Sequence, residues 1–246
     1  MTALISHVVT HLLLPPAVLQ GLWVRVRTPR LPEASGPCRG IVEGESPPLN
    51  LVVLGESPVA GIGAPTHELA LTGQTALALA RRSNRKVNWR ALGLSGATAE
   101  RARLDLVPEI ADEFADILIV VLGVNDVIQW RGVSRWTRDI EQLVDVVRRQ
   151  VSTRLVVLTG VPPFQCFPAF PQPLRSILGM RSRLLDRAYC DLAKRLPNVI
   201  HVSSQFELGR EFFCEDGFHP SQSGYAAWGD QLAEVIVHGP SFSLCA

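Results

Sequence analysis

The chain is built from short apolar runs that alternate with longer segments of helical periodicity. Most of the apolar runs are continuous rather than interleaved with polar residues, which indicates strands of a parallel sheet that is covered on both faces. Gly, Pro or polar residues follow each run, as expected where buried strands end. The five predicted strands occupy residues 51–54, 87–92, 117–122, 155–158 and 199–202.

Between these runs, apolar residues recur every three or four positions, which is typical of helices with one buried face. In residues 134–150, for example, Trp136, Ile140 and Leu143 share a face, and Arg, Asp and Gln occupy the opposite one. A strand followed by a helix, repeated about five times, predicts a three-layer α/β/α doubly wound domain. The predicted helices cover residues 68–83, 134–150, 176–196 and 221–237.

The N-terminal part of the chain does not follow this alternation. Residues 4–24 are mostly apolar, but histidines, two prolines and a glutamine interrupt them, and no Lys or Arg precedes them as in a secretory signal. We expect a helix that packs on the domain, makes a homodimer contact or lies on a membrane surface, with a membrane anchor as the alternative. Residues 28–50, rich in Pro, Gly and Ser, are predicted to be an irregular connector. The expected division is an N-terminal segment, 1–49, and one domain, 50–246.

Composition narrows the classes of protein that fit. With 246 residues, 47% hydrophobic and 19% charged, the chain is long enough to bury a core without metal or disulfides. A net charge of +1 gives no sign of a nucleic-acid partner. The five cysteines form no CxxC pair and match no zinc spacing, so we expect reduced thiols, no metal and a cytoplasmic location, with membrane association through the N-terminal segment as an alternative. A Cys166–Cys214 bridge remains open.

Residues of types that can act in catalysis follow four of the predicted strands. Ser57 stands in Gly-Glu-Ser-Pro after the first strand, Gly96 in a glycine-containing loop after the second, and Asn125 after the third. Asp216 and His219 follow the last strand with two residues between them. Ligands of doubly wound folds bind beyond the carboxyl ends of the strands, so these side chains are expected to meet. A hydroxyl, an imidazole, a carboxylate and polar hydrogens are the groups that acyl transfer needs.

In their order and spacing, these blocks resemble the GDSL or SGNH hydrolase family of esterases and lipases over residues 50–237. The resemblance implies a flavodoxin-like SGNH fold and a carboxylic ester hydrolase that needs no cofactor. It also implies that Ser57 is the nucleophile, His219 the base and Asp216 the partner of the base, acting through an acyl-enzyme. The oxyanion donors that it implies are the N–H groups of Ser57 and Gly96 and the side-chain amide of Asn125.

Two details of the sequence qualify the match. The family usually has Asp where this chain has Glu56, so the contacts of that carboxylate with the neighbouring loop are expected to differ. Gly-Glu-Ser-Pro also occurs around Ser46, but only Ser57 follows a long apolar run, so the context selects Ser57.

Pro58 has no N–H and cannot serve as an oxyanion donor, although it suits the first turn of a helix.

Structural roles are the alternatives for several of these residues. Ser57 could simply cap a helix, and Asn125 or Asp126 could cap the helix after their strand, which is the favoured interpretation for Asp126. Residues 161–173 contain three Phe and five Pro, and composition supports equally a wall of an acyl pocket and a loop whose Phe residues fill the core.

The expected substrate is a small-molecule ester with a short to medium acyl chain. Thioesterase, lysophospholipase and carbohydrate acetylesterase activities remain open at the same site. A non-catalytic α/β module that binds a small ligand is the alternative from another class, but such a module has no need of a positioned base.

Overall fold

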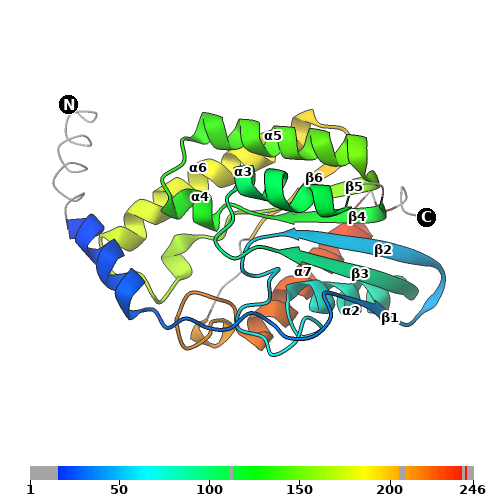
Figure 1. Cartoon of the computed structure of the whole chain (residues 1–246), viewed down its shortest axis with the longest axis horizontal. Helices are drawn as coiled ribbons and strands as arrows, with labels where there is room; N and C mark the ends of the chain where they lie inside the picture. Colours follow the sequence, from blue (N-terminus) through cyan, green and yellow to red (C-terminus); the bar gives the residue numbers. More distant parts are fainter. Residues whose placement is uncertain (1–15, 111–112, 205–208, 240–241, 243–246) are drawn as a thin grey trace.

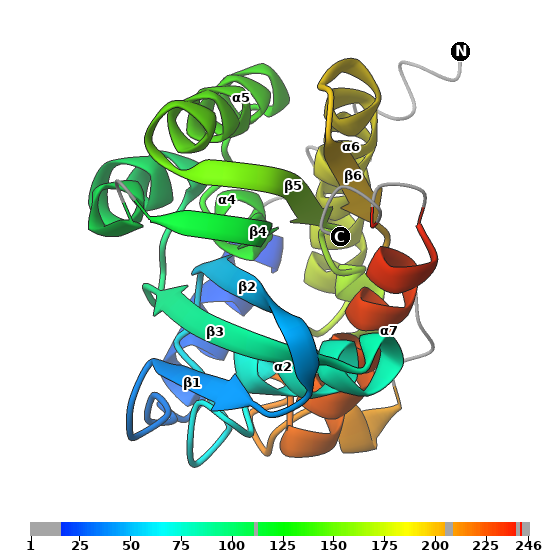
Figure 2. The same cartoon turned by 90° about the vertical axis from the view of Figure 1, so that its right-hand side faces the viewer.

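The computed structural model describes residues 16–110, 113–204, 209–239 and 242, and it shows a six-stranded sheet between two layers of helices (Figures 1 and 2). The strand order is β1-β3-β2-β4-β5-β6, in which β1 pairs antiparallel with β3 and all other pairs are parallel. The order therefore reverses between β2 and β4, which is the topological switch point where such sheets bind ligands. The strands are β1 (Arg39–Val42), β2 (Glu45–Gly55), β3 (Arg85–Gly93), β4 (Phe114–Val121), β5 (Ser152–Thr159) and β6 (Val199–Val202).

The central strands bury both faces, which explains their continuous apolar sequence. In β2, Leu51 and Val53 belong to one buried cluster, and Val52 and Leu54 belong to the other. Successive side chains of a strand point to opposite faces, so a strand that has helices on both sides needs apolar residues at every position.

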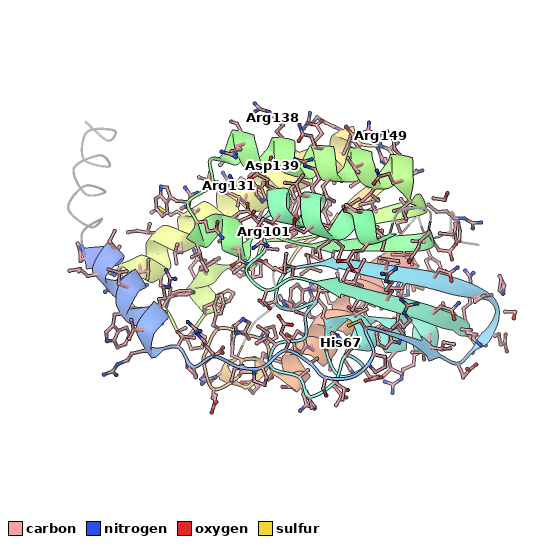
Figure 3. The ribbon with its side chains drawn as sticks, viewed as in Figure 1. His67, Arg101, Arg131, Arg138, Asp139 and Arg149 are labelled. Carbon is pink, nitrogen blue, oxygen red and sulfur yellow. The ribbon has the colours of Figure 1, made fainter. Side chains whose placement is uncertain are left out.

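Long helices cover both faces of the sheet (Figure 2). On one face lie α2 (Leu71–Ser83) and α7 (Gln222–His238), and on the other lie α5 (Val133–Gln150) and α6 (Leu174–Arg195). The amphipathic pattern of α5 is directly visible, because Arg138 and Arg149 point away from the sheet (Figure 3). The predicted three-layer α/β fold is thereby confirmed.

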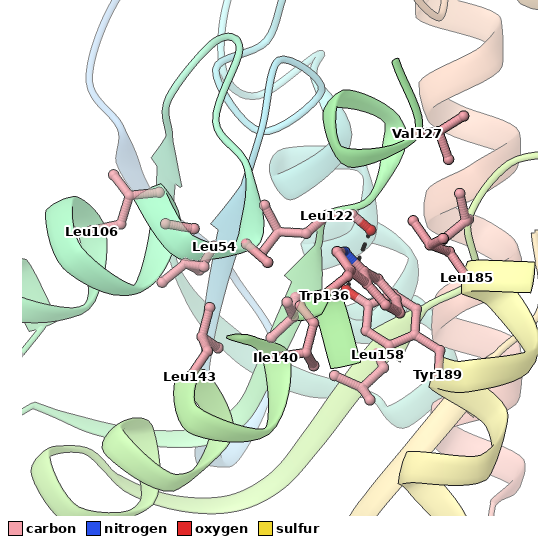
Figure 4. Close-up of a cluster of buried hydrophobic side chains, with 14 of the residues drawn as sticks. Leu54, Leu106, Leu122, Val127, Trp136, Ile140, Leu143, Leu158, Leu185 and Tyr189 are labelled. Carbon is pink, nitrogen blue, oxygen red and sulfur yellow. Dashed lines mark hydrogen bonds between the residues drawn. The ribbon is translucent and has the colours of Figure 1, made fainter. Parts of the chain in front are cut away.

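One aromatic pair ties the helices α5 and α6 to the end of β4 (Figure 4). The rings of Trp136 and Tyr189 meet edge to face with centroids 4.5 Å apart, and both side chains are fully buried. The Tyr189 hydroxyl donates a hydrogen bond to the carbonyl of Leu122 at 3.3 Å. This contact satisfies a buried hydroxyl and fixes the backbone one residue beyond β4, close to where the predicted site residues begin.

The five predicted strands and four predicted helices are all present, with shifted ends. The prediction of an irregular connector over residues 28–50 is wrong at its end, because β1 and the first half of β2 lie there. Several short elements were not predicted: α3 (Ala99–Arg101), η1 (Ala102–Leu106), η2 (Val107–Ile110), α4 (Val124–Ile128), η3 (Phe164–Cys166) and η4 (Arg210–Phe212).

The described part of the apolar N-terminal stretch is helical over residues 16–27. Ala17 and Val24 are buried in the core on the side of α6, so this helix packs on the domain. The remainder of the predicted segment, with His7 and His11, lies outside the described residues. Across residues 16–110, 113–204 and 209–239, no helix has both the length and the apolar character needed to span a bilayer.

Candidate active site

The strand register brings three of the predicted blocks together. Gly55 at the end of β2 pairs with Gly93 of β3 on one side and with Val121 of β4 on the other. The pairing extends one step further, because the Glu56 N–H donates to the Val121 carbonyl at 3.1 Å and the Leu94 N–H donates to the Gly55 carbonyl at 3.0 Å. The loops that carry Ser57, Gly96 and Asn125 therefore leave the sheet side by side.

Ser57 lies in a series of tight turns directly after β2. Its carbonyl accepts a hydrogen bond from the Ile62 N–H at 3.1 Å, and residues 57–63 form turns rather than a helix. The expectation that Pro58 begins a helix is therefore wrong, and so is the alternative that Ser57 is a helix cap. A side chain at Gly93 would collide with the backbone of Ala60, so a glycine at the end of β3 is needed for this turn to pack. Ser46, with the same flanking residues, lies at the exposed opposite end of β2.

Asp216 and His219 form a pair that is built within one short loop. His219 Nδ1 is 2.6 Å from Asp216 Oδ2, and Asp216 Oδ1 accepts hydrogen bonds from the N–H groups of Phe218 at 2.9 Å and His219 at 3.0 Å. Burial opposes ionisation of this carboxyl, but the hydrogen bonds from the His219 ring and the two amides outweigh it and hold the pKa of Asp216 below its usual value. An ionised carboxylate on Nδ1 keeps the proton on that nitrogen and leaves Nε2 as the acceptor.

Ser57 and His219 line the same small cavity of about 60 Å³, next to apolar side chains such as Phe167, Phe213 and Trp228. The lining of this cavity does not include Gly96 or Asn125. Gly96 is exposed and adopts a φ of +79°, a left-handed conformation that favours glycine. The structure thus brings Ser57 and His219 to one cavity, with Asp216 bonded to His219, and places Gly96 and Asn125 on adjoining loops.

Glu56 has a role that the sequence did not reveal. Its Oε1 accepts the Val124 N–H at 3.0 Å and its Oε2 accepts the Asn125 N–H at 3.0 Å, together with a hydrogen bond from the Asn125 side-chain amide. The carboxyl thus binds the first turn of α4, where backbone N–H groups lack partners within the helix. Burial raises the pKa of Glu56 to about 8, and the nearby charge of Asp126 acts in the same direction, against the hydrogen bonds.

The Asn125 side chain is held by Glu56. A side-chain amide carries two N–H bonds, and the hydrogen bond to Glu56 uses one of them. Glu56, which directly precedes Ser57, therefore positions a side chain 69 residues away in the sequence.

Asp126 connects two loops of the site, which corrects its predicted role. It does not cap its own helix, whose N-terminal flanking residue is Gly123; its Oδ2 accepts the Ala99 N–H at the start of α3, at 3.1 Å. Burial raises the pKa of Asp126 to about 6, opposed by this hydrogen bond and by Arg131. The contact ties the loop that carries Gly96 to the loop that carries Asn125.

The Phe-rich segment after β5 fills the core and also reaches the cavity at Ser57. Phe164, Phe167 and Phe170 are all buried and their rings contact one another with centroids 5.0–6.0 Å apart. Phe167 also lines the cavity at Ser57, and it packs on Phe218, whose ring meets His219 edge-on at 4.7 Å. These aromatic side chains pack against the imidazole, and they make the cavity wall apolar.

The described cysteines Cys38, Cys166, Cys190 and Cys214 are free thiols, so the Cys166–Cys214 bridge is not formed. His201 pairs with Asp186 at 2.9 Å, but this second His–Asp pair joins β6 to α6 and does not line the cavity at Ser57. Within the described ranges, no three His, Cys, Asp or Glu side chains gather as a metal site would require.

The comparisons with known proteins agree with this architecture. Residues 53–227 match the model of the GDSL-like lipase/acylhydrolase family. No curated protein matches the sequence.

Solved structures of similar fold include the family 3 carbohydrate esterase of Clostridium thermocellum, with 13% identity and a TM-score of 0.62 over 81% of this chain and 100% of the other. TesA has 18% identity and a TM-score of 0.61 over 78% and 99% of the two chains. A putative arylesterase from Agrobacterium tumefaciens has 21% identity and a TM-score of 0.57 over 77% and 98%. At these identities, the likeness concerns the fold.

Proposed function

Because this chain belongs to the GDSL-like lipase/acylhydrolase family and is a carboxylic ester hydrolase, we propose that it acts through a Ser57–His219–Asp216 triad. The observation that carries the proposal is the geometry of His219. Its Nδ1 is held by a buried, ionised Asp216, and His219 lines the same cavity as Ser57.

In the proposed first step, Nε2 of His219 removes the proton of the Ser57 hydroxyl as the oxygen attacks the ester carbonyl. The new C–O bond gives a tetrahedral oxyanion. When the oxyanion collapses, the bond to the alcohol breaks, and the imidazolium gives its proton to the departing alcohol. An acyl-enzyme on Ser57 remains.

In the second step, His219 takes a proton from water, and the water oxygen attacks the acyl-enzyme. The second oxyanion collapses to release the carboxylic acid, and the proton returns to Ser57. Asp216 stays ionised throughout and stabilises the imidazolium in both steps.

The proposed oxyanion donors are the N–H groups of Ser57 and Gly96 and the Asn125 amide. Pro58 has no N–H to contribute. Register and hydrogen bonds support the assignment, since the three loops leave the sheet together and the Glu56 and Asp126 carboxyls hold them in place. Preorganised donors lower the barrier because they need no reorganisation when charge develops.

For the substrate, we propose an ester whose acyl part is apolar. The cavity at Ser57 is walled by Phe167, Phe213, Phe218 and Trp228, which suits an acyl chain better than a sugar ring. Ester, thioester and lysophospholipid substrates share such an acyl group, and the leaving group distinguishes them.

The test is hydrolysis of p-nitrophenyl butyrate by the wild type and by Ser57→Ala, His219→Ala and Ser46→Ala. We expect the first two variants to lose nearly all turnover and Ser46→Ala to retain it. Full activity of Ser57→Ala would remove the serine from the mechanism. Comparing butyryl esters with the matching thioester then assigns the leaving group.

A further inference from the structure

A second cavity, much larger than the first, lies between the N-terminal helix and α6. It has a volume of about 950 Å³, which is in the upper part of the range for small-molecule sites, about 300–1,000 Å³. Residues 16–27 form one wall, and in Figure 1 this helix, in blue, lies beside the beginning of α6. Apolar side chains that line the groove include Val18, Leu22, Trp130, Leu174, Ile177 and Leu178.

The groove reaches the reacting centre. Phe218 and His219 line both the groove and the cavity that contains Ser57. Phe170, which packs against Phe218 with ring centroids 5.7 Å apart, also lines the groove. A chain attached to a carbonyl at Ser57 can therefore pass the imidazole and continue into the groove.

The wall formed by the N-terminal helix is anchored. Gln20 donates from Nε2 to the Gln172 carbonyl at 2.5 Å and accepts from the Leu174 N–H at 3.0 Å, so one amide binds the start of α6 at two points. Ala17 and Val24, on the same side of the helix, are buried in the core. All of these helix residues precede residue 53, where the family match begins, so this wall of the groove lies outside the matched region.

The groove is also lined by large apolar side chains that are held in place or exposed to solvent. Trp130 is 51% exposed, and the guanidinium of Arg181 lies 4.1 Å from its ring centroid and holds it. Leu22, on the opposite wall, is 56% exposed. Large apolar side chains facing a groove are stabilised when an apolar ligand removes them from water.

We propose that this groove binds the acyl chain of long-chain esters, and that the segment from residue 16 to Glu33 sets the preference for chain length. The proposal rests on the proposed function, because it places the ester carbonyl at Ser57. It extends the substrate beyond the short to medium chains expected from the sequence. The chemical class is an unbranched alkyl or alkenyl chain, since the lining offers mainly carbon.

Binding can be tested without catalysis. The full-length Ser57→Ala protein is titrated with 11-(dansylamino)undecanoic acid, and palmitate or acetate is then added as competitor. We expect saturable fluorescence enhancement that palmitate reverses and acetate does not. The matched variants Leu22→Arg and Leu19→Arg add the same charge to the same helix, but only Leu22 lines the groove. We expect at least a tenfold weaker affinity for the first and less than a twofold change for the second.

Kinetics provides the second readout, with p-nitrophenyl decanoate and acetate as substrates below their aggregation limits. The ratio of kcat/KM for decanoate to that for acetate should fall at least tenfold in Leu22→Arg and stay within twofold in Leu19→Arg. Absence of probe binding, or equal ratios in the two variants, overturns the groove proposal while ester hydrolysis through Ser57 stands. Probe binding by a protein that hydrolyses none of the esters instead contradicts the proposed function and leaves the groove intact.

Discussion

Two buried carboxyl groups of the site have nearly the same set of hydrogen-bond donors and opposite ionisation behaviour. Asp216 accepts two backbone N–H groups and the Nδ1–H of His219, and Glu56 accepts two backbone N–H groups and the amide of Asn125. The pKa of Asp216 is lowered, whereas that of Glu56 is raised to about 8.

The difference shows that the number of hydrogen bonds does not decide the charge of a buried acid. At Glu56, burial outweighs the hydrogen bonds, and the charge of another acid, Asp126, adds to its effect. Asp216 has an imidazole beside it that becomes cationic in the proposed mechanism. One carboxylate is therefore suited to stabilise a developing positive charge, and the other to hold a loop.

The largest expected effect comes from Asp216→Asn, which keeps the shape of the loop and removes the charge. The amide cannot fix the same tautomer of His219, so kcat for p-nitrophenyl butyrate should fall by roughly 10³- to 10⁴-fold. Glu215→Gln changes the adjacent, exposed carboxylate and is the control, with turnover expected within twofold of the wild type. Equal turnover of wild type and Asp216→Asn would show that the pair is only structural.

Asn125→Ala tests the other half of the comparison, in which a carboxyl holds an amide rather than an imidazole. Loss of one oxyanion donor should lower kcat by about 100-fold or more, with little change in KM. Gln129→Ala removes an exposed amide just past the end of α4 and should leave kcat unchanged. A large rise in KM with normal kcat would place Asn125 in substrate binding instead.

The smallest expected effect is on how the free energy of unfolding depends on pH. In this respect the two carboxyl groups act in opposite directions. Because the pKa of Glu56 is raised from 4.5 to about 8, the folded state binds this proton more tightly. The stability it gives is fully present below about pH 4.5 and is lost as pH rises through 8. Asp216, with a lowered pKa, contributes in the opposite sense: its stabilisation is present above pH 3.8 and is lost as pH falls through the folded pKa.

Urea unfolding of the wild type and Glu56→Gln between pH 5 and 8 measures this effect. The unfolding free energy of the wild type relative to the variant should decline with pH, by at most about 1.4 kcal/mol per pH unit, the limit for one proton. Glu45→Gln, at the exposed start of the same strand, should track the wild type at every pH. A relative stability that stays flat or rises over this range would mean that Glu56 is ionised when folded.

Local patterns predicted the parts of the molecule that depend on local chemistry. The central strands were predictable because burial on both faces requires apolar residues at every position, as in residues 51–54. The pairing of Asp216 with His219 was predictable because only two residues lie between them in one short loop. By contrast, β1 was missed, since this edge strand, Arg-Gly-Ile-Val, alternates between exposed and partly buried residues within a polar segment.

Features that join distant segments could not be derived from the sequence. Glu56 and Asn125 are 69 residues apart, and nothing in either block shows that the longer acid reaches the amide. The groove depends on Gln20 meeting the start of α6, 154 residues away. For the Phe-rich loop, composition showed that the side chains would be buried, but only the tertiary structure distinguishes Phe164, in the core, from Phe167 at the cavity.

The central claim is that Ser57 is the nucleophile that His219 activates, and the most direct measurement is the site of covalent labelling. The protein is treated with a fluorophosphonate, digested and mapped by mass spectrometry, in parallel with Ser57→Ala and Ser46→Ala. We expect one phosphonate adduct on Ser57 in the wild type and in Ser46→Ala, and none in Ser57→Ala. An adduct on another residue, or equal labelling of Ser57→Ala, would contradict the account.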